Sequence, residues 1–327
     1  MLGVICGTRP EFIKLQPLLK ALDAKRKPYK LIAIGQHTDL LPADVDITVE
    51  DRQGINRLDT IFSTILSCSN IFQGVTQLLV QGDTATAAAT ALGAFHRGIP
   101  VIHLEAGLRS YDVDSPFPEE SYRRMISSVS SYNLCPTEVN YNNLLLEQSP
   151  GESFVVGNTV LDNLSKEGTS YGNKVLITLH RRENHTLIGG WFSKLNALSK
   201  EFKDLDFVFI NHPNPSISDN VFLLSPSITV LEPQDHEGFI ELLKECRFVV
   251  SDSGGLQEEC SWLNKRIIVC RQVTERTESL GTSSILCPVP GQLPNIFRYV
   301  AKDYKINYPC PYGQGDTAEK ILSLGII

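Results

Sequence analysis

The sequence predicts an α/β protein built from two doubly wound parallel sheets, one in each of two Rossmann-like units. Short apolar runs alternate with amphipathic stretches along the whole chain. The runs LLVQ (78–81) and PVIHL (100–104) are apolar rather than alternating, as expected for strands that helices cover on both faces. The alternation lapses in the Gly-, Ser- and Asn-rich stretch 157–174 and then begins again, which indicates two units.

The first half opens with an apolar strand that leads through a turn into an amphipathic helix. Thr8 and Glu11 have the S/T-x-x-E spacing of a capping box, and Phe12, Leu15 and Leu19 follow at helical spacing. The same reasoning predicts strands at 2–6, 30–34, 77–81, 100–104, 132–135 and 153–156, and helices near 9–22, 84–96, 118–130 and 137–147.

The second half repeats this pattern after a junction near residue 165. Strands are predicted at 175–179, 206–210, 228–231, 248–251 and 266–270, and helices near 190–203, near 236–245 and from about 255. Two such units would place a cleft between them, and ligands of this fold class bind beyond the carboxyl ends of the strands. We therefore expect the chemistry to lie at strand ends.

The composition is that of a globular protein without a large anionic partner. Hydrophobic residues make up 42% of the 327 residues and charged residues 20%, which are ordinary values. The formal charge of −7 and the pI near 5.6 argue against binding to nucleic acid or to an anionic membrane surface. No run approaches the roughly 20 apolar residues of a membrane helix, and no signal peptide is recognisable.

The 8 cysteines are scattered without a C-x-x-C pair, and several lie in apolar, strand-like runs. This pattern predicts reduced thiols in a cytoplasmic protein. The string Asn184-His185-Thr186 has the letters of a glycosylation sequon, and we attribute the match to chance.

Arg9 and Lys14 pose an electrostatic question. Both follow the turn at Gly7 and lie in the first turns of a helix whose N-terminus already carries partial positive charge. Cations are favourable at that position only if an anion is brought to the same place. The sequence therefore predicts an anionic ligand at the start of the first helix.

Carboxylates follow the next two strands of the first half. Asp83 comes directly after a predicted strand, where an N-cap role competes with a functional one, and its strand-end position favours function. Glu105 follows the next strand at an i,i+4 spacing from Arg109, which a surface ion pair would also explain. Gly107 interrupts any helix between them and leaves room for a ligand.

A third acid begins a predicted helix. Glu119 and Glu120 lie in its first turn, and Arg123 and Arg124 follow one turn later. Acids at a helix start are commonly complements of the helix dipole, so this pattern is weak support for a site when taken alone.

The second half places phosphate-receptive groups at its strand ends. His180 ends a strand and is followed by two arginines, which favours phosphate binding over a structural role. His212 follows the next strand. Ser253 and Gly254 begin a glycine turn from a strand into a helix, which suits a phosphate, although a simple tight turn has the same letters. Glu259 and the glutamate before it could hold sugar hydroxyls.

Other chemistries are disfavoured by missing motifs. Histidines and cysteines lack the spacing of metal ligands, and neither a P-loop nor a G-x-S-x-G elbow occurs. A phosphate turn, a basic cluster and three carboxylates remain. This set suits proton transfer on a sugar that carries a diphosphate.

Taken together, these motifs resemble those of the non-hydrolysing UDP-N-acetylglucosamine 2-epimerases from residue 3 to the carboxyl end. The matching blocks are GTRPEFIK, QGDTATA, HLEAGLRS, FPEESYRR, PTE, VGNTV, TLHRREN, HPNP, SDSGGLQEE, TER and PYGQGDTAEKI. The resemblance implies a GT-B-like fold with domains at 1–165 and 166–315, the second binding UDP, and a final helix at 316–327 packing back on the first. It also implies a homodimer that needs no metal and no nicotinamide.

The resemblance further implies roles for single residues, and these answer the electrostatic question. The implied anion is the UDP moiety, or the negative charge that develops as UDP leaves. Matching positions imply catalytic roles for Lys14, Asp83, Glu105, Glu119 and His180, and substrate contacts for Arg9, Arg123, His212, Ser253, Gly254, Glu259 and Arg276.

The implied reaction interconverts UDP-GlcNAc and UDP-ManNAc. A carboxylate removes the proton from sugar carbon 2 as UDP departs from carbon 1, and UDP then adds back to the 2-acetamidoglucal as the proton returns to the other face. Which acid removes the proton stays open. Raised pKa values would mark the candidates.

Alternative functions remain at this stage. They are epimerisation of a UDP-linked 6-deoxy-2-acetamido sugar, hydrolysis to ManNAc and UDP, glycosyl transfer, and sugar-nucleotide binding without turnover.

Gln36 and His37 match positions at which some bacterial relatives bind a second, activating UDP-GlcNAc, but the segment that follows them is shorter here. Thr277 replaces a proline that is common in the family, which concerns loop rigidity more than chemistry.

Overall fold

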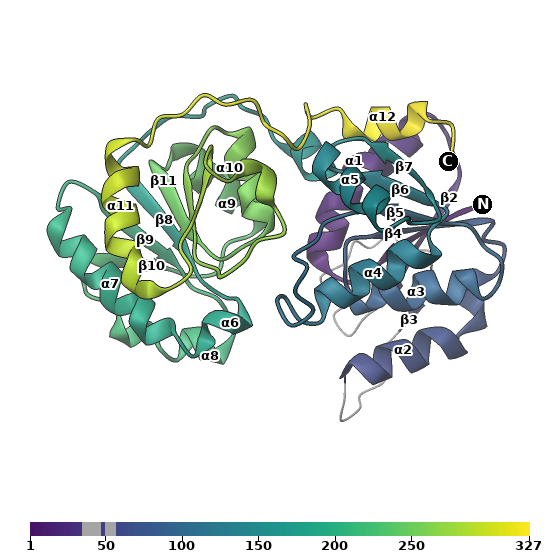
Figure 1. Cartoon of the computed structure of the whole chain (residues 1–327), viewed down its shortest axis with the longest axis horizontal. Coiled ribbons are helices and arrows are strands. Elements are labelled where there is room, and N and C mark those ends of the chain that lie inside the picture. Colours follow the sequence, from purple (N-terminus) through teal and green to yellow (C-terminus); the bar gives the residue numbers. More distant parts are fainter. Residues whose placement is uncertain (35–46, 50–56) are drawn as a thin grey trace. The chain divides into compact units, whose positions relative to one another are not determined.

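The computed structural model describes residues 1–34, 47–49 and 57–327, and it divides the chain into two compact units. The first unit comprises Met1–Leu164 together with Tyr312–Ile327, and the second comprises Ser165–Pro311 (Figure 1). Each unit consists of a parallel sheet with helices on its faces, so the predicted α/β class is confirmed.

The sheet of the first unit has the strand order β3-β2-β1-β4-β5-β6-β7 among the described residues, and every pair is parallel. Its strands are β1 (Leu2–Cys6), β2 (Tyr29–Ile34), β3 (Ile47–Val49), β4 (Gln77–Gln81), β5 (Val101–Leu104), β6 (Tyr132–Cys135) and β7 (Glu152–Val155). Its helices are α1 (Arg9–Ala24), α2 (Arg57–Ser67), α3 (Ala85–Phe95), α4 (Glu119–Val129), α5 (Glu138–Leu146) and α12 (Thr317–Ser323), with short 3-10 turns η2 (Ser69–Phe72) and η3 (Thr159–Asn163).

Two apolar layers bury the two faces of this sheet. The alanines of α3 pack with α2 and α4 on one face, and the leucines of α1 pack with α12 on the other. Because both faces are covered, the central strands are buried on both sides, which explains why their sequences are apolar rather than alternating.

The C-terminal segment returns to the first unit. Asp162 of η3 accepts hydrogen bonds from the backbone N–H groups of Thr317 (3.1 Å) and Ala318 (2.7 Å), so its carboxylate satisfies the first turn of α12. Ile321 of the same helix is buried in the layer beneath α1. A capping group and an apolar face thus hold α12 in place.

The sheet of the second unit has the order β10-β9-β8-β11-β12-β13, again with every pair parallel. Its strands are β8 (Lys174–Thr178), β9 (Asp206–Ile210), β10 (Ile228–Leu231), β11 (Phe248–Ser251), β12 (Ile267–Val269) and β13 (Ser284–Leu286). Its helices are α6 (Arg182–His185), α7 (Ile188–Glu201), α8 (Pro215–Ser218), α9 (His236–Glu245), α10 (Gly255–Trp262) and α11 (Leu293–Lys302), with short 3-10 turns η4 (Val221–Leu223), η5 (Thr277–Ser279) and η6 (Pro290–Gln292).

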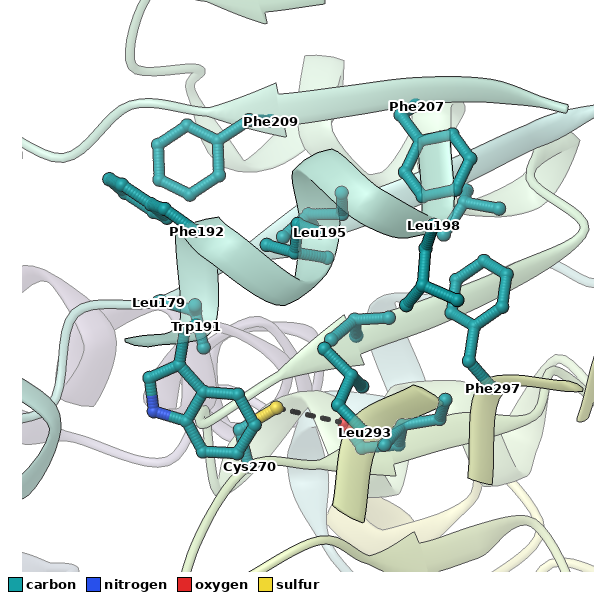
Figure 2. Close-up of a cluster of buried hydrophobic side chains, with 14 of the residues drawn as sticks. Leu179, Trp191, Phe192, Leu195, Leu198, Phe207, Phe209, Cys270, Leu293 and Phe297 are labelled. Atoms are coloured by element: carbon teal, nitrogen blue, oxygen red, sulfur yellow. Dashed lines mark hydrogen bonds between the residues drawn. The ribbon is translucent and has the colours of Figure 1, made fainter. Parts of the chain in front are cut away.

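Aromatic side chains fill the core between this sheet, α7 and α11 (Figure 2). Phe297 of α11 stacks on Phe207 at a centroid distance of 5.4 Å, and Phe192 meets Phe209 edge to face at 5.3 Å. Trp191 is fully buried in the same core. Its ring N–H donates to the amide oxygen of Asn184 at 2.9 Å.

The predicted strands and helices are confirmed to within two or three residues at their ends, including all four predicted helices of the first unit. Six helices and strands of the described chain were not predicted: β3, α2, α6, α8, β13 and α11. None of the 8 cysteines forms a disulfide bond, and 7 of them are buried, in keeping with the prediction that several of them act as small apolar residues. In the described part of the chain, no helix is long and apolar enough to cross a membrane.

Candidate active site

The turn between β1 and α1 is held by a buried carboxylate. Thr8 caps the helix and accepts from the backbone N–H of Glu11 (3.4 Å), as the capping box predicts. The Glu11 carboxylate accepts from the Gly7 N–H (3.0 Å) and the Thr8 hydroxyl (2.8 Å), and also from the hydroxyl of Thr84 (2.7 Å). Glu11 therefore joins this turn to the turn after β4, and burial raises its pKa.

Lys14, one turn further along α1, forms an ion pair with Glu105 at the end of β5 (2.5 Å). The amide of Gln81, the last residue of β4, donates to the same Glu105 oxygen. The Glu105 side chain is only 4% exposed, so the cation and the amide bond a carboxylate that is largely shielded from water.

The backbone at Glu105 has a left-handed conformation (φ 68°), which is uncommon for a residue other than glycine. Gly107 follows with φ 86°, and a Cβ there would lie 2.2 Å from the backbone oxygen of Asn140. The segment after β5 is thus forced into a tight turn against α5. Strain of this kind collects at functional sites, and here it occurs at a residue whose carboxylate forms an ion pair with Lys14.

Asp83, after β4, forms a second ion pair at this end of the sheet. The Arg123 guanidinium of α4 donates to its carboxylate at 2.7 Å. Arg123 also donates to Glu120 (3.1 Å), whose buried carboxylate accepts from the backbone N–H groups of Ser110 and Tyr111. The network therefore ties Asp83 to the loop that follows Glu105.

Three other residues that the sequence singled out in the first unit lie at a helix start or in a different ion pair. Glu119 is half-buried at the first position of α4, one turn before Arg123. Arg9 is exposed at the first position of α1. Arg109 is buried and bonds Glu147 of the α5 end (2.7 Å), so it does not form the surface pair with Glu105 that its spacing allowed.

His103 lies beneath these carboxylates and was not predicted. The side chain is fully buried in β5, and its Nε2 is 2.8 Å from the Gly82 carbonyl oxygen, immediately before Asp83. Burial lowers its pKa to about 4, so the ring is neutral near pH 7 and donates to that carbonyl. Gly82 itself has φ 70°, so the hydrogen bond fixes a turn that glycine permits.

In the second unit, the predicted His180 lies against Asp252, which the sequence analysis did not single out. Both Asp252 oxygens accept from the His180 backbone N–H at 3.0 Å, and Oδ2 also accepts from the Arg181 N–H and from the Asn184 amide (2.9 Å). The His180 Nδ1 is 3.4 Å from Oδ1. Burial lowers the pKa of His180, and the Asp252 charge opposes that shift.

Asn184 is buried, with its amide oxygen accepting from the Trp191 indole N–H (2.9 Å). The sequon match is therefore a coincidence of letters, as predicted. The His212 ring stacks on His180 at a centroid distance of 5.1 Å and an interplanar angle of 15°. The Asn214 N–H donates to His212 Nδ1 (3.1 Å), which places the ring hydrogen of a neutral His212 on Nε2.

The turn from β11 into α10 carries the predicted phosphate residues. The Ser253 N–H bonds the Ser251 hydroxyl (3.0 Å), and Gly254 precedes the first turn without a side-chain cap. A Cβ on Gly254 would lie 2.7 Å from Arg276, so packing accounts for that glycine. A Cβ on Gly255 would meet nothing within 4 Å, which leaves open space beside the first turn of the helix.

Arg276 is buried and forms ion pairs with Glu258 (2.6 Å) and Glu275 (2.5 Å). Glu258 is itself fully buried, so its role as a sugar-hydroxyl ligand is not supported. The predicted Glu259 accepts from His236 of α9 at 3.2 Å. These contacts join α10 to Glu275 and Arg276 and to His236 of α9.

The structure thus groups Lys14, Asp83, Glu105 and Arg123 in the first unit, and His180 with His212 in the second. Among the described residues, no group of three or more His, Cys, Asp or Glu side chains is placed to hold a metal ion. Gln36 and His37 lie outside the described residues. The missed partners Gln81, His103 and Asp252 share one signal: each lies in or directly beside a predicted strand end.

Two parallel doubly wound units with polar groups at their strand ends define a GT-B-like protein. The family model described as UDP-N-acetylglucosamine 2-epimerase matches residues 20–324. The UDP-N-acetylglucosamine 2-epimerases of Neisseria meningitidis and Campylobacter jejuni are 32% and 31% identical to the chain, over 97% and 98% of it and 97% and 96% of their own lengths.

Solved structures agree with this likeness. The UDP-GlcNAc 2-epimerase of Neisseria meningitidis bound to UDP-GlcNAc has a TM-score of 0.87 at 31% identity, covering 99% of each chain. The Methanocaldococcus jannaschii enzyme in complex with UDP-GlcNAc and UDP has a TM-score of 0.84 at 29% identity, covering 99% of this chain and 98% of that one. The chain belongs to the UDP-N-acetylglucosamine 2-epimerase family, and is therefore an enzyme of the isomerase class.

Proposed function

We propose that the protein is a non-hydrolysing 2-epimerase that interconverts UDP-GlcNAc and UDP-ManNAc. The observation that carries the proposal is the presence of two partly buried ion pairs at the strand ends of the first unit, Lys14 with Glu105 and Asp83 with Arg123. Each pair holds a carboxylate capable of proton transfer beside a cation capable of binding an anionic leaving group. A protein that only binds a nucleotide needs the cations but not the acids.

The second unit supports the nucleotide half of the proposal. The open space beside Gly255 lets a diphosphate approach the backbone N–H groups at the start of α10. His212 presents a ring N–H donor, and His180 lies against it. The neighbouring relatives with UDP-GlcNAc bound point to the same ligand for this chain.

The proposed mechanism has two balanced halves. A carboxylate takes the proton from carbon 2 while the bond between carbon 1 and the diphosphate oxygen breaks, which gives 2-acetamidoglucal and UDP. UDP then re-forms the bond to carbon 1 as a proton returns to the opposite face of carbon 2. Because a carbon acid of this kind is weak, leaving-group stabilisation must carry much of the barrier, at roughly 3–4 kcal/mol for one well-placed donor.

The experiment is incubation of the purified protein with UDP-GlcNAc in deuterated water. We expect deuterium at carbon 2, which mass spectrometry detects, and formation of UDP-ManNAc, which proton NMR detects. Free ManNAc as the main product would instead establish the hydrolysing alternative. No exchange would favour a UDP-linked 6-deoxy sugar, to be tried as substrate next, or binding without turnover.

Two variants separate catalysis from binding in the same assay. Asp83→Asn and Glu119→Gln are expected to keep UDP affinity within about threefold and to lose about 100-fold or more in exchange rate, the usual contribution of general acid–base catalysis. A parallel loss of UDP affinity would mean that these acids are structural. The homodimer and the cytoplasmic location implied by the resemblance are part of the proposal, and sedimentation would test the first.

A further inference from the structure

We propose that Asp252 is the positioning residue for His180, and that His180 gains a proton on Nε2 when a nucleoside diphosphate binds to the second unit. The inference rests on the proposed function, because it concerns the same nucleotide. It adds a proton to the binding step and assigns opposite ring tautomers to two neighbouring histidines.

The Asp252 carboxylate is held in place beside the His180 ring. It is fully buried, and three N–H donors hold it: the backbone groups of His180 and Arg181 and the Asn184 amide. Asn184 is in turn held by the indole N–H of Trp191, which the aromatic core of the unit fixes (Figure 2). A rigid chain of contacts therefore runs from the core to the carboxylate beside the His180 ring.

The neighbour of each Nδ1 atom determines which nitrogen of a neutral ring carries the hydrogen. Asp252 Oδ1 lies 3.4 Å from His180 Nδ1, so a neutral His180 keeps its hydrogen on Nδ1, facing the carboxylate. His212 is the reverse, because its Nδ1 accepts from the Asn214 N–H and its hydrogen is therefore on Nε2. The stacked rings thus carry their hydrogens on different nitrogens.

The oxygens of an ionised diphosphate only accept hydrogen bonds. His212 can donate through Nε2 without change. His180 in its Nδ1–H form presents a lone pair at Nε2, so it becomes a donor only by taking a second proton from solvent. The buried Asp252 charge then balances the imidazolium, and the ring lies between two anions.

Other charged groups near His180 also act on its ring. Arg181 disfavours a proton on His180, as does the His212 ring, whereas Glu183 favours it together with Asp252. The His185 Nε2 of α6 lies 3.3 Å from the His180 carbonyl oxygen, and the His185 charge acts on His212. Burial lowers the pKa of His180, so the ring is neutral in the free protein near pH 7.5 and takes up the proton on binding.

Calorimetry of UDP binding to the full chain, in buffers with different ionisation enthalpies, tests the proton count. At pH 7.5 we expect uptake of close to one proton per UDP in the wild type. We expect close to none in Asp252→Asn and His180→Gln, with UDP affinity about tenfold weaker. His185→Gln, a matched loss of a neighbouring histidine, is expected to keep the uptake.

A charge-relocating double variant guards against a folding defect. Asn184→Asp with Asp252→Asn keeps the net charge and one hydrogen bond between the two side chains. It moves the negative charge from residue 252, which faces His180 Nδ1, to residue 184. We expect thermal stability closer to that of the wild type than in Asp252→Asn alone, and still no proton uptake. Uptake by this double variant would mean that Asp252 is only structural.

Nitrogen-15 NMR of labelled histidines reads the tautomers in the wild type directly. We expect Nδ1–H for free His180, an imidazolium in the UDP complex, and Nε2–H for His212 in both. UDP binding without proton uptake, or an Nε2–H tautomer for free His180, would overturn the inference alone. No UDP binding by the wild type would overturn the proposed function and the inference with it.

Discussion

At the scale of single residues, the site depends on polar groups that lie at the ends of strands or just after them. The Glu105 carboxylate accepts hydrogen bonds from Lys14 of α1 and from Gln81 of β4. The Asp83 carboxylate accepts one from Arg123 of α4. A carboxylate held by a cation is poised to exchange that cation for a substrate group. The preorganisation comes from the chain and therefore costs nothing further when substrate binds.

The sequence predicted the charged residues of this set but not the uncharged residues that hydrogen-bond beside them. Gln81 and His103 carry no charge at neutral pH, and each is ordinary in an apolar run. Their importance follows from strand register, because β4 and β5 pair Gln81 with Leu104 and so bring its amide to the residue that follows. Asp252 was missed for a similar reason, since its partners lie about 70 positions earlier in the chain.

His103 should make the protein sensitive to acid in a definite window. Its pKa falls from 6.5 to about 4 on folding, so the unfolded chain binds the proton more readily and stability is lost as pH drops from about 6.5 to 4. This one group accounts for about 2 kcal/mol between pH 7 and pH 5.

The His103→Gln variant tests that account by urea denaturation at the two pH values. It keeps a donor for the Gly82 carbonyl but cannot titrate, so its loss of stability between pH 7 and pH 5 is expected to be about 2 kcal/mol smaller than that of the wild type. An identical loss in both proteins would show that His103 is not the group that senses acid.

At the scale of elements, the hydrophobic period located most strands and helices. Continuous apolar runs and 3.6-residue spacing are strong signals when helices cover both faces of a sheet. The strand β13 gave a weaker signal, because its 3 residues begin with Ser284 and include only two apolar side chains, whereas β12 consists of three. The helix α11 did carry one, with Leu293, Phe297 and Val300 on one face, and the prediction stopped short of it.

The attachment of α12 illustrates what local sequence does not reveal. Asp316 occupies the usual N-cap position but makes no capping bond, and Asp162 from η3 takes that role instead. The capping residue and the helix are separated by more than 150 positions, so no local motif could identify the pair.

Asp162→Ala is therefore expected to lower the free energy of unfolding by about 1–2 kcal/mol, since it leaves two backbone N–H groups without their acceptor. Asp316→Ala is the matched control. It removes only an exposed pair with Lys320 and is expected to change stability by less than about 0.5 kcal/mol. Equal losses in thermal or chemical denaturation would contradict the assignment of the cap.

At the scale of the whole molecule, two units with the same architecture contribute different chemistry to the proposed reaction. The first unit holds the ion-paired carboxylates, and the second holds the paired histidines and the glycine turn. The fold class could be predicted because the alternation of strands and helices occurs twice.

The central claim is that the bond between the sugar and the diphosphate breaks and re-forms during epimerisation. The most direct measurement uses UDP-GlcNAc labelled with oxygen-18 in the bridge between carbon 1 and the β-phosphorus. Phosphorus NMR is predicted to show the label moving to non-bridging β-phosphate positions as carbon 2 inverts. Inversion at carbon 2 with all of the label still in the bridge would contradict the account.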